Sequence, residues 1–158
     1  MTTIRVHVDS ELPAERFLSA ARDFSDRRTE VFPAVRSDHF VVHAEAGTSA
    51  DVTEGTPAIV GINWERCTYD WSETDRVVAT VTESNVYAHP GSVWTLMAIP
   101  TDHGSRVDMV WERRFRRSPR GVFWGTMFRL AGRPIFRSYA RDIVKNVERL
   151  DSAARAAQ

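Results

Sequence analysis

Alternation of hydrophobic and polar residues is the main pattern in the first 115 residues of the chain. Ile4, Val6 and Val8 alternate with charged or polar neighbours, which is the period-two pattern of a half-buried β-strand. Six later stretches are also typical of strands: residues 37–44, 50–56, 59–71, 76–86, 92–99 and 106–115. Turn-forming residues separate them, for example in segments 72–75, 89–91 and 102–105. Because the connections are short, we expect a seven-stranded antiparallel sheet.

Helical periodicity flanks this β-rich stretch on both sides. Phe17 and Leu18 belong to an apolar stripe at helical spacing after the first strand, and a short second helix or irregular turn is expected at 25–32. A long terminal helix starts after Ser118, since serine is a favoured N-cap and a proline follows it in the first turn. Pro134 lies inside this helical pattern, so we expect a kink or a short break there.

The length and composition are those of one ordinary globular domain. The 158 residues are 42% hydrophobic and 27% charged, which is enough to bury a core without disulfides or metals. The single cysteine, Cys67, excludes an internal disulfide framework and a four-cysteine zinc site. The N-terminus lacks the apolar region of a signal peptide, and no apolar stretch is long enough to cross a membrane. We therefore expect a single cytoplasmic domain over residues 1–158.

The net charge of zero conceals two oppositely charged segments. Residues 1–112 contain 9 basic and 18 acidic residues, whereas residues 113–158 contain 12 basic and 3 acidic residues. The first segment therefore carries a formal charge of −9 and the second a formal charge of +9. The basic segment either neutralises the acidic body within the same chain or meets an anionic partner.

The order of the expected elements and several local motifs resemble a known superfamily. The motifs are segment 12–17 after the first strand, the run 55–71 with Trp64-Glu65-Arg66 and Tyr69-Asp70-Trp71, and the entry into the terminal helix at Pro119. They are similar to the helix-grip fold of the START-like, or SRPBCC, superfamily, and most of all to its polyketide cyclase/dehydrase and lipid transport group. The resemblance implies an α+β fold in which a seven-stranded antiparallel sheet wraps around a long C-terminal helix and leaves an apolar cavity. That superfamily includes enzymes, carriers and pure binders, so the fold alone does not decide the function.

Aromatic and methionine side chains are the candidates for the lining of such a cavity. Met109 and Trp111 share one face of their expected strand, and that apolar face should point at the helix. On the long central strand, the face of Cys67 and Tyr69 is slightly favoured. The alternative is ordinary core packing, in which aromatic side chains are also common. The candidate ligand-binding residues are Cys67, Tyr69, Trp94, Met109, Trp111, Phe123, Met127 and Phe136.

Three polar residues of the central strand, Glu65, Tyr69 and Asp70, are weak candidates for acid–base catalysis. They are interleaved with aromatic residues, and burial of a carboxyl or phenol against tryptophan shifts its pKa. An enzyme of the resembled group would use such a group in a cyclase or dehydratase reaction on an apolar carbonyl compound. The alternative is an arginine–carboxylate pair on the outer face of the sheet, so the sequence leaves open whether the protein is an enzyme.

The sequence contains no motif for a metal, a cofactor or a hydrolase. His39 and His43 have the spacing of a helical metal pair, but their neighbours predict a strand, on which four residues span about 13 Å. That separation is too large for both imidazoles to ligate one zinc ion. There is also no G-x-S-x-G motif and no phosphate-binding loop. We therefore expect no metal and no cofactor.

Arginine and aromatic residues are concentrated around the start of the terminal helix. Arginines at 113, 114, 116, 117 and 120 precede or enter the helix, and further arginines follow at 129, 133, 137 and 141. They lie beside Phe123, Trp124 and Phe128. Such a helix face is either simply solvated, or docks on an anionic lipid or protein surface, or contacts nucleic-acid phosphates, although no nucleic-acid motif accompanies it.

These patterns predict a protein that binds a mostly apolar small molecule in a cavity between the sheet and the terminal helix. A polyketide, an isoprenoid or a lipid-like compound would suit such a cavity. A cyclase or dehydratase and a peripheral membrane protein are the alternatives. The expected partners are a hydrophobic small-molecule ligand and, for the basic helix, an anionic membrane surface, with no nucleic acid. The chain is expected to be a monomer or a homodimer.

Overall fold

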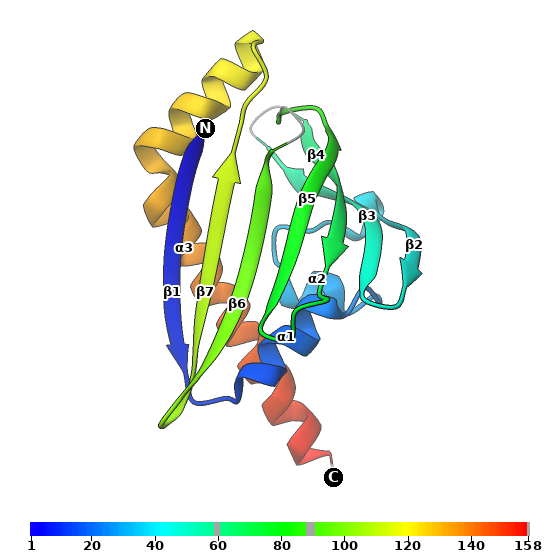
Figure 1. Ribbon diagram of the computed structural model, residues 1–158, viewed down its shortest axis with the longest axis vertical. Helices are drawn as coiled ribbons and strands as arrows, with labels where there is room; N and C mark the ends of the chain where they lie inside the picture. Colours follow the sequence, from blue (N-terminus) through cyan, green and yellow to red (C-terminus); the bar gives the residue numbers. More distant parts are fainter. Residues whose placement is uncertain (59–60, 88–90, 158) are drawn as a thin grey trace.

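A curved sheet with a long helix across its concave face makes up the fold (Figure 1). The computed structural model describes residues 1–58, 61–87 and 91–157. The strands are β1 (Thr2–Ser10), β2 (Phe40–Ala46), β3 (Ser49–Pro57), β4 (Ile62–Asp70), β5 (Arg76–Ser84), β6 (Val93–Thr101) and β7 (Gly104–Arg113). The helices are α1 (Ala14–Arg22), α2 (Arg28–Val31), the 3-10 helix η1 (Ser37–His39) and α3 (Pro119–Ala156).

The strands follow the order β1-β7-β6-β5-β4-β3-β2, and every neighbouring pair is antiparallel. From β2 to β7 each strand pairs with the next one in the sequence, while β1 pairs with β7. The first and last strands of the chain therefore lie side by side. This arrangement confirms the predicted seven-stranded antiparallel sheet for the described part of the chain.

The boundaries of two strands differ from the sequence prediction. Residues 37–39 were expected in a strand but form η1, in which the His39 backbone N–H donates a hydrogen bond to the Arg36 carbonyl at 3.1 Å. The expected strand start at 59–60 and most of the expected turn at 89–91 lie outside the described residues. The remaining strands begin and end close to their predicted limits.

Helix α3 begins as the sequence predicts but does not break at Pro134. The Ser118 hydroxyl accepts a hydrogen bond from the Gly121 backbone N–H at 3.1 Å and so caps the helix. The helix then continues without interruption to Ala156, so the expectation of a break is wrong. Instead, α3 changes direction within its first half (Figure 1). A helix can bend at a proline without ending, because only one of its backbone hydrogen bonds is lost.

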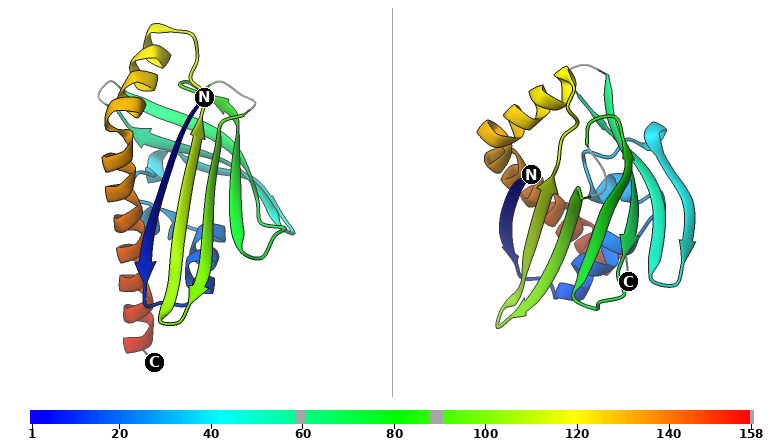
Figure 2. Two further views of the ribbon diagram at one scale, coloured as in Figure 1. Left: turned by 60° about the vertical axis from the view of Figure 1, so that its left-hand side comes forward. Right: turned by 45° about the horizontal axis from the view of Figure 1, so that its top comes forward.

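The helix is held close to both the sheet and the short helices. Gly132 permits the close approach to β1, because a Cβ at this residue would overlap the side chain of Ile4. Helices α1 and α2 lie beside the C-terminal half of α3 (Figure 2). There the Asn146 side chain donates a hydrogen bond to the Val31 carbonyl at 3.2 Å. The inward-facing side chains of the sheet are consequently enclosed beneath α3 and form the core.

Candidate functional site

A small cavity of about 50 Å³ lies between the concave face of the sheet and α3. Its lining residues are Arg28, Phe32, Glu54, Glu65, Tyr69, Ala79, Trp94, Trp111, Arg113 and Tyr139. The space has room for a few water molecules and is well below the roughly 150 Å³ of a cavity that holds benzene. The resemblance implied an apolar cavity, whereas this one is lined by two arginines and two glutamates as well as aromatic rings.

Arg28 is the most deeply buried charged residue of the cavity, with 1% of its side chain exposed. Its Nε donates to the Glu54 carboxylate at 2.8 Å, and one Nη donates to the Tyr69 hydroxyl at 3.0 Å. That hydroxyl donates in turn to the second oxygen of Glu54 at 2.9 Å. The other Nη donates to the Ala21 carbonyl at 3.0 Å. Each nitrogen of the Arg28 guanidinium therefore has a partner.

Two phenylalanine rings enclose the Arg28 guanidinium. Its central carbon lies 4.8 Å from the ring centroid of Phe24 and 4.0 Å from that of Phe32, within the range of cation–π attraction. Burial alone would lower the pKa of Arg28, but the adjacent Glu54 carboxylate, together with Tyr69 and Tyr139, more than offsets this effect and holds the pKa above its ordinary value. Arg28 is thus a fixed cation at one side of the cavity.

A second ion pair, between Glu65 and Arg113, forms another part of the cavity wall. The two Nη atoms of Arg113 donate to the two carboxylate oxygens of Glu65 at 3.1 and 3.3 Å. The guanidinium also lies 4.5 Å from the ring centroid of Tyr87. The Nε of Arg113 is buried and has no hydrogen-bond partner among the described residues. A buried donor without a partner costs about 1–3 kcal/mol, so this atom favours a molecule that brings an acceptor.

Burial and charge make Glu65 the titratable group of the cavity. Burial raises the pKa of Glu65, the Arg113 guanidinium opposes this rise, and the negative Glu54 adds to it. Burial also raises the pKa values of Tyr69 and Cys67 well above their ordinary range, so the phenol and the thiol stay protonated at neutral pH. Glu65 is therefore the carboxyl group best placed to exchange a proton within the cavity.

Aromatic rings form the apolar part of the wall. The ring centroid of Trp111 lies 4.5 Å from that of Phe136 and 6.4 Å from that of Tyr139, both on α3. On the other strands, the Tyr69 and Trp94 centroids are 6.4 Å apart. The cavity thus combines flat apolar surfaces with a few fixed charges, which is the usual composition of a small-molecule site.

The structure brings four of the sequence-selected residues to this cavity: Glu65, Tyr69, Trp94 and Trp111. They come from β4, β6 and β7, which are separated in sequence and meet on the concave face.

Three more candidates lie close to the cavity without lining it. Cys67 and Met109 are buried on the concave face, with 3% and 0% of their surface exposed. Phe136 packs on the far side of Trp111. These residues support the wall rather than contact its interior.

The structure does not bring Asp70, Phe123 or Met127 to the cavity. Asp70 follows Tyr69 on β4 and therefore points to the opposite, outer face, where it accepts a hydrogen bond from the Ser72 hydroxyl at 2.7 Å. Phe123 is 47% exposed near the start of α3 and packs edge-on against Trp124. Met127 is partly exposed one turn further along the same helix.

Sequence reasoning missed Arg28, Glu54 and Tyr139 as site residues. Glu54 follows Val52 at the period of a strand, so a charge on an otherwise apolar face was visible in the sequence. Arg28 is four residues from both Phe24 and Phe32, which is the spacing of one helix face. Tyr139 gave no comparable signal, because it belongs to the long apolar stripe of the terminal helix.

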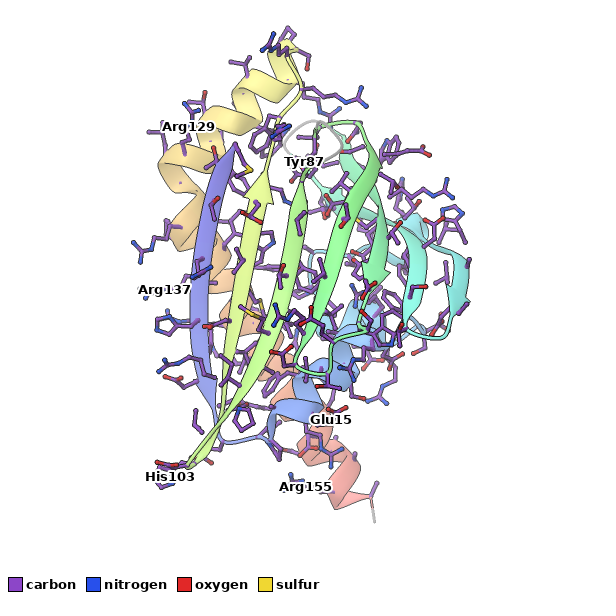
Figure 3. The ribbon with its side chains drawn as sticks, viewed as in Figure 1. Glu15, Tyr87, His103, Arg129, Arg137 and Arg155 are labelled. Carbon is purple, nitrogen blue, oxygen red and sulfur yellow. The ribbon has the colours of Figure 1, made fainter. Side chains whose placement is uncertain are left out.

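A larger groove of about 750 Å³ lies elsewhere, where the β1–α1 connection, the β6–β7 hairpin and α3 meet. Its charged residues include Asp9 and Arg106, which are 68% and 50% exposed and pair with each other at 3.1 Å. His103, labelled in Figure 3, marks the tip of the hairpin at this end of the molecule. Water and salt screen exposed charges of this kind, and among the described residues no phenylalanine, tyrosine or tryptophan lines the groove. The small cavity is therefore the better candidate site.

Comparison with solved structures finds close matches in architecture. The protein TTHA0849 of Thermus thermophilus superposes with a TM-score of 0.75 at 18% identity, over 97% of this chain and 99% of that chain. The ZhuI aromatase/cyclase from Streptomyces sp. R1128 gives a TM-score of 0.74 at 12% identity, over 94% of both chains. A START superfamily protein from Mycobacterium smegmatis gives 0.74 at 11% identity, over 94% of this chain and 98% of that one.

The chain has the helix-grip fold. Its seven-stranded sheet and long terminal helix match those of START-type proteins over nearly their whole length, which confirms the fold that the sequence resemblance implied. No protein-family model matches the sequence, and no curated protein matches it. At identities below 20% the similarity to helix-grip proteins concerns the fold, so the function has to be argued from the cavity itself.

Proposed function

We propose that the protein binds a small organic molecule in the cavity between the sheet and α3. The ligand has an apolar, ring-containing body that packs on Trp94 and Trp111, and a polar group that meets the Glu65–Arg113 pair. The observation that carries this proposal is the placement of two ion pairs around a cavity, on a face of the sheet that is otherwise apolar.

Stability alone does not account for these two ion pairs. Replacing a buried ion pair with apolar residues of similar volume is often neutral or stabilising, because taking two charges out of water is costly. Charged groups with shifted pKa values that line a cavity are instead characteristic of functional sites. Arg28, Glu65 and Arg113 are groups of this kind, and they favour a binding or reaction site over a purely structural core.

The cavity wall also narrows the class of ligand. Its two arginines and two glutamates sum to no net charge, which suits an uncharged molecule with hydrogen-bonding oxygens. A carbonyl or hydroxyl oxygen can accept a hydrogen bond from the Nε–H of Arg113. An oxygen-bearing polyketide matches this mixture better than an unfunctionalised acyl chain, and the similarity of the fold to an aromatase/cyclase supports that class. Because the cavity measures about 50 Å³, binding requires the side chains of α3 to move away from the sheet.

Mass spectrometry of the freshly purified protein, first native and then denaturing, tests the proposal directly. A stoichiometric small molecule that is released on unfolding would support it and identify the compound class. In parallel, prodan serves as a fluorescent probe, because it is an uncharged naphthalene that carries a carbonyl oxygen. We expect Arg113→Met to weaken binding of this probe or of the released compound, whereas Arg66→Met should not. Arg66 is the matched control because it pairs with Asp51 at 2.6 Å on the outer face.

The same experiments can also contradict the binding proposal. A protein that carries no small molecule and binds the probe equally well with Arg113→Met and Arg66→Met does not use this cavity as a ligand site. A circular dichroism spectrum and a melting curve for each variant show that it is folded under the conditions of the assay.

A second candidate function, acid–base catalysis, is favoured by the raised pKa of Glu65. In a cyclase reaction, the Glu65 carboxylate removes a proton from a carbon next to a carbonyl, and that carbon forms a bond with a second carbonyl carbon. The resulting alkoxide takes the proton back from Glu65. In a dehydratase step, Glu65 removes a second proton from the same carbon and donates it to the departing hydroxyl, so that water leaves and a C=C bond forms. Arg113 Nε donates to the carbonyl oxygen on which negative charge develops.

The variant Glu65→Gln separates catalysis from binding. If the protein is a cyclase or dehydratase, Glu65→Gln should abolish conversion of an open-chain aromatic polyketone while the probe still binds. Equal conversion by the wild-type protein, by Glu65→Gln and by a blank without protein would exclude the catalytic function and leave the binding function standing.

A further inference from the structure

The first half of α3 and the segment before it form a one-sided concentration of positive charge. Residues 114–141 contain eight arginines and no aspartate or glutamate. Arg129, Arg133 and Arg137 are exposed on the helix, and none of them forms an ion pair with a described residue. Arg129 and Arg137 project away from the sheet (Figure 3). Their charges are therefore not neutralised by the acidic body of the same chain.

Exposed hydrophobic residues lie among these arginines. Val122 is 63% exposed, Phe123 47% and Leu130 80%, and all three belong to α3. Residues seven apart share one helix face, so Leu130 lies in line with Phe123 and Arg137. We call Val122, Phe123, Leu130, Arg129, Arg133 and Arg137 the outer α3 surface. It has the composition of a helix that rests in a membrane interface, with apolar residues flanked by cations.

We propose that the outer α3 surface docks on an anionic lipid bilayer. Phe123 and Leu130 insert among the acyl chains, and the arginines contact the lipid phosphates. In the described part of the chain no helix is long and apolar enough to cross a membrane, so α3 lies along the interface. Charge complementarity points to this partner. The arginines have no acidic residue among them, so they favour a surface with a high density of negative charge.

Two other occupants fit the outer α3 surface less well. Nucleic acid would pair with the arginines, but a side chain as exposed as Leu130 gains nothing against a phosphate backbone. A second copy of the chain would bring two sets of arginines together if the same face were used, and like charges repel. An anionic bilayer is the partner that uses both the charges and the exposed apolar side chains.

The charge distribution of the whole chain also orients the protein on such a bilayer. Residues 1–112 carry a formal charge of −9, and residues 142–158 contain all three acidic residues of the basic segment. A negative membrane surface attracts the first half of α3 and repels the acidic body. The outer α3 surface shares no residue with the cavity, so docking and ligand binding are independent proposals.

Vesicle co-sedimentation with the full chain tests the docking proposal. The probes are vesicles of phosphatidylcholine alone and vesicles of phosphatidylcholine mixed with phosphatidylglycerol. We expect binding to the mixed vesicles only, and a marked decrease as the salt concentration rises from about 0.01 M to about 1 M, where charges more than a few ångströms apart are screened. Equal binding to both vesicles, or no binding to either at low salt, would overturn the proposal.

Paired variants locate the contact. Arg129→Gln/Arg133→Gln should weaken binding to the anionic vesicles by about 25-fold, because each arginine near the surface contributes about fivefold. The matched control, Arg106→Gln/Arg155→Gln, removes the same charge at the opposite end of the molecule, where Figure 3 labels Arg155. This control should bind like the wild type. Equal weakening by both pairs would show a net-charge effect and contradict a defined surface.

The apolar contribution needs its own pair of variants. Leu130→Gln should reduce binding to anionic vesicles at least tenfold, whereas Ile99→Gln, which changes a 45% exposed residue on β6, should leave it unchanged. An oligonucleotide is the alternative partner to test. If replacing Arg129 and Arg133 abolishes binding to an oligonucleotide but leaves binding to anionic vesicles unchanged, the surface binds nucleic acid and the bilayer proposal is rejected. Melting curves for each variant confirm that the fold is intact.

Discussion

Glu54 and Glu65 lie directly opposite each other on β3 and β4, and each carboxylate is held by a different arginine. Two like charges at opposed positions of an antiparallel pair destabilise a sheet. Arg28 binds Glu54 at 2.8 Å and Arg113 binds Glu65 at 3.1 Å, so the repulsion is balanced by two separate cations. The cavity therefore depends on a balanced set of four charges, and removal of any one of them leaves the others poorly compensated.

The Arg28–Glu54 pair should be sensitive to single substitutions. We expect Arg28→Met to lower the free energy of unfolding by about 3–5 kcal/mol, because Glu54 is left in a buried site without its cation. The double variant Arg28→Met/Glu54→Met should recover much of this loss. Urea denaturation measures both effects. Arg76→Met, which breaks exposed ion pairs with Glu73 and Asp75, is the control and should give no measurable change.

The Tyr69 hydroxyl should stabilise the same network. It accepts a hydrogen bond from Arg28 and donates one to Glu54, so Tyr69→Phe leaves two buried groups with one partner fewer. We expect a loss of about 1–3 kcal/mol in the free energy of unfolding. Tyr139→Phe changes another phenol of the same cavity for which no hydrogen bond is found in the described structure, and it should have a smaller effect. Equal losses for the two variants would mean that the hydroxyl is not part of the network.

The pKa of Glu65 makes a prediction about pH. Burial raises this pKa, with Glu54 adding to the rise and Arg113 opposing it, so the folded protein binds the proton more tightly than the unfolded chain. The contribution of Glu65 to stability is therefore complete below its unfolded pKa and is lost as the pH rises through its folded pKa. Carbon-13 NMR of the side-chain carboxyls should show Glu65 titrating above its ordinary range.

Two comparisons check the assignment of that titration. Arg113→Gln removes the opposing cation and should raise the pKa of Glu65 further. Asp51 serves as an internal reference whose pKa is shifted in the opposite direction, because the hydrogen bonds from Arg66 hold the pKa of Asp51 below the usual range. If Glu65 in the folded protein titrates at or below the ordinary glutamate value, it is not the proton-exchanging group of the cavity.

The fold was predictable because its determinants are local. Alternation in residues 4–8, turn residues between strands and the Ser118 cap each act over a few residues. The structure confirms the first strand, the helix cap and the turns at 72–75 and 102–105, while most of the turn at 89–91 lies outside the described residues. Of the kink or short break expected at Pro134, the break is wrong, because α3 is continuous through this residue, and the helix changes direction within its first half instead. The local sequence indicates that a proline tends to interrupt a helix. It does not show the tertiary contacts of that helix, which also decide whether it continues.

The cavity was predictable only in part because its key contacts are not local. The alternation of Cys67 and Tyr69 correctly indicated an inward face, and Tyr69 lines the cavity. The partner of Tyr69 is Arg28, which lies 41 residues earlier and reaches it from α2. No spacing rule predicts such a pairing from one sequence. What the local sequence does show is a charged residue at an inward-facing position of a strand, which needs a buried partner, and Glu54 is such a residue.

Trp111 joins the packing of α3 to the cavity, so its replacement should affect both stability and binding. The residue is 3% exposed, and its ring lies against Phe136 with 4.5 Å between centroids. We expect Trp111→Ala to lower the free energy of unfolding by about 3–5 kcal/mol, since the neighbours cannot fill the space of an indole. Trp64→Ala removes a 36% exposed indole from the outer face of β4 and should lower it by less than about 1 kcal/mol.

Trp111→Phe, compared with Trp64→Ala, shows whether Trp111 contacts the ligand or only supports the fold. Trp111→Phe keeps an aromatic ring in the core and should remain folded, so its ligand binding can be measured even if Trp111→Ala unfolds. If Trp111 contacts the ligand, Trp111→Phe should weaken binding of the uncharged probe prodan and Trp64→Ala should not. A ligand that changes the tryptophan fluorescence of the wild-type protein should cause a smaller change in Trp111→Phe, in which Trp94 is the remaining tryptophan of the cavity wall. Unchanged affinity in a stably folded Trp111→Phe would mean that this indole supports α3 without contacting the bound molecule.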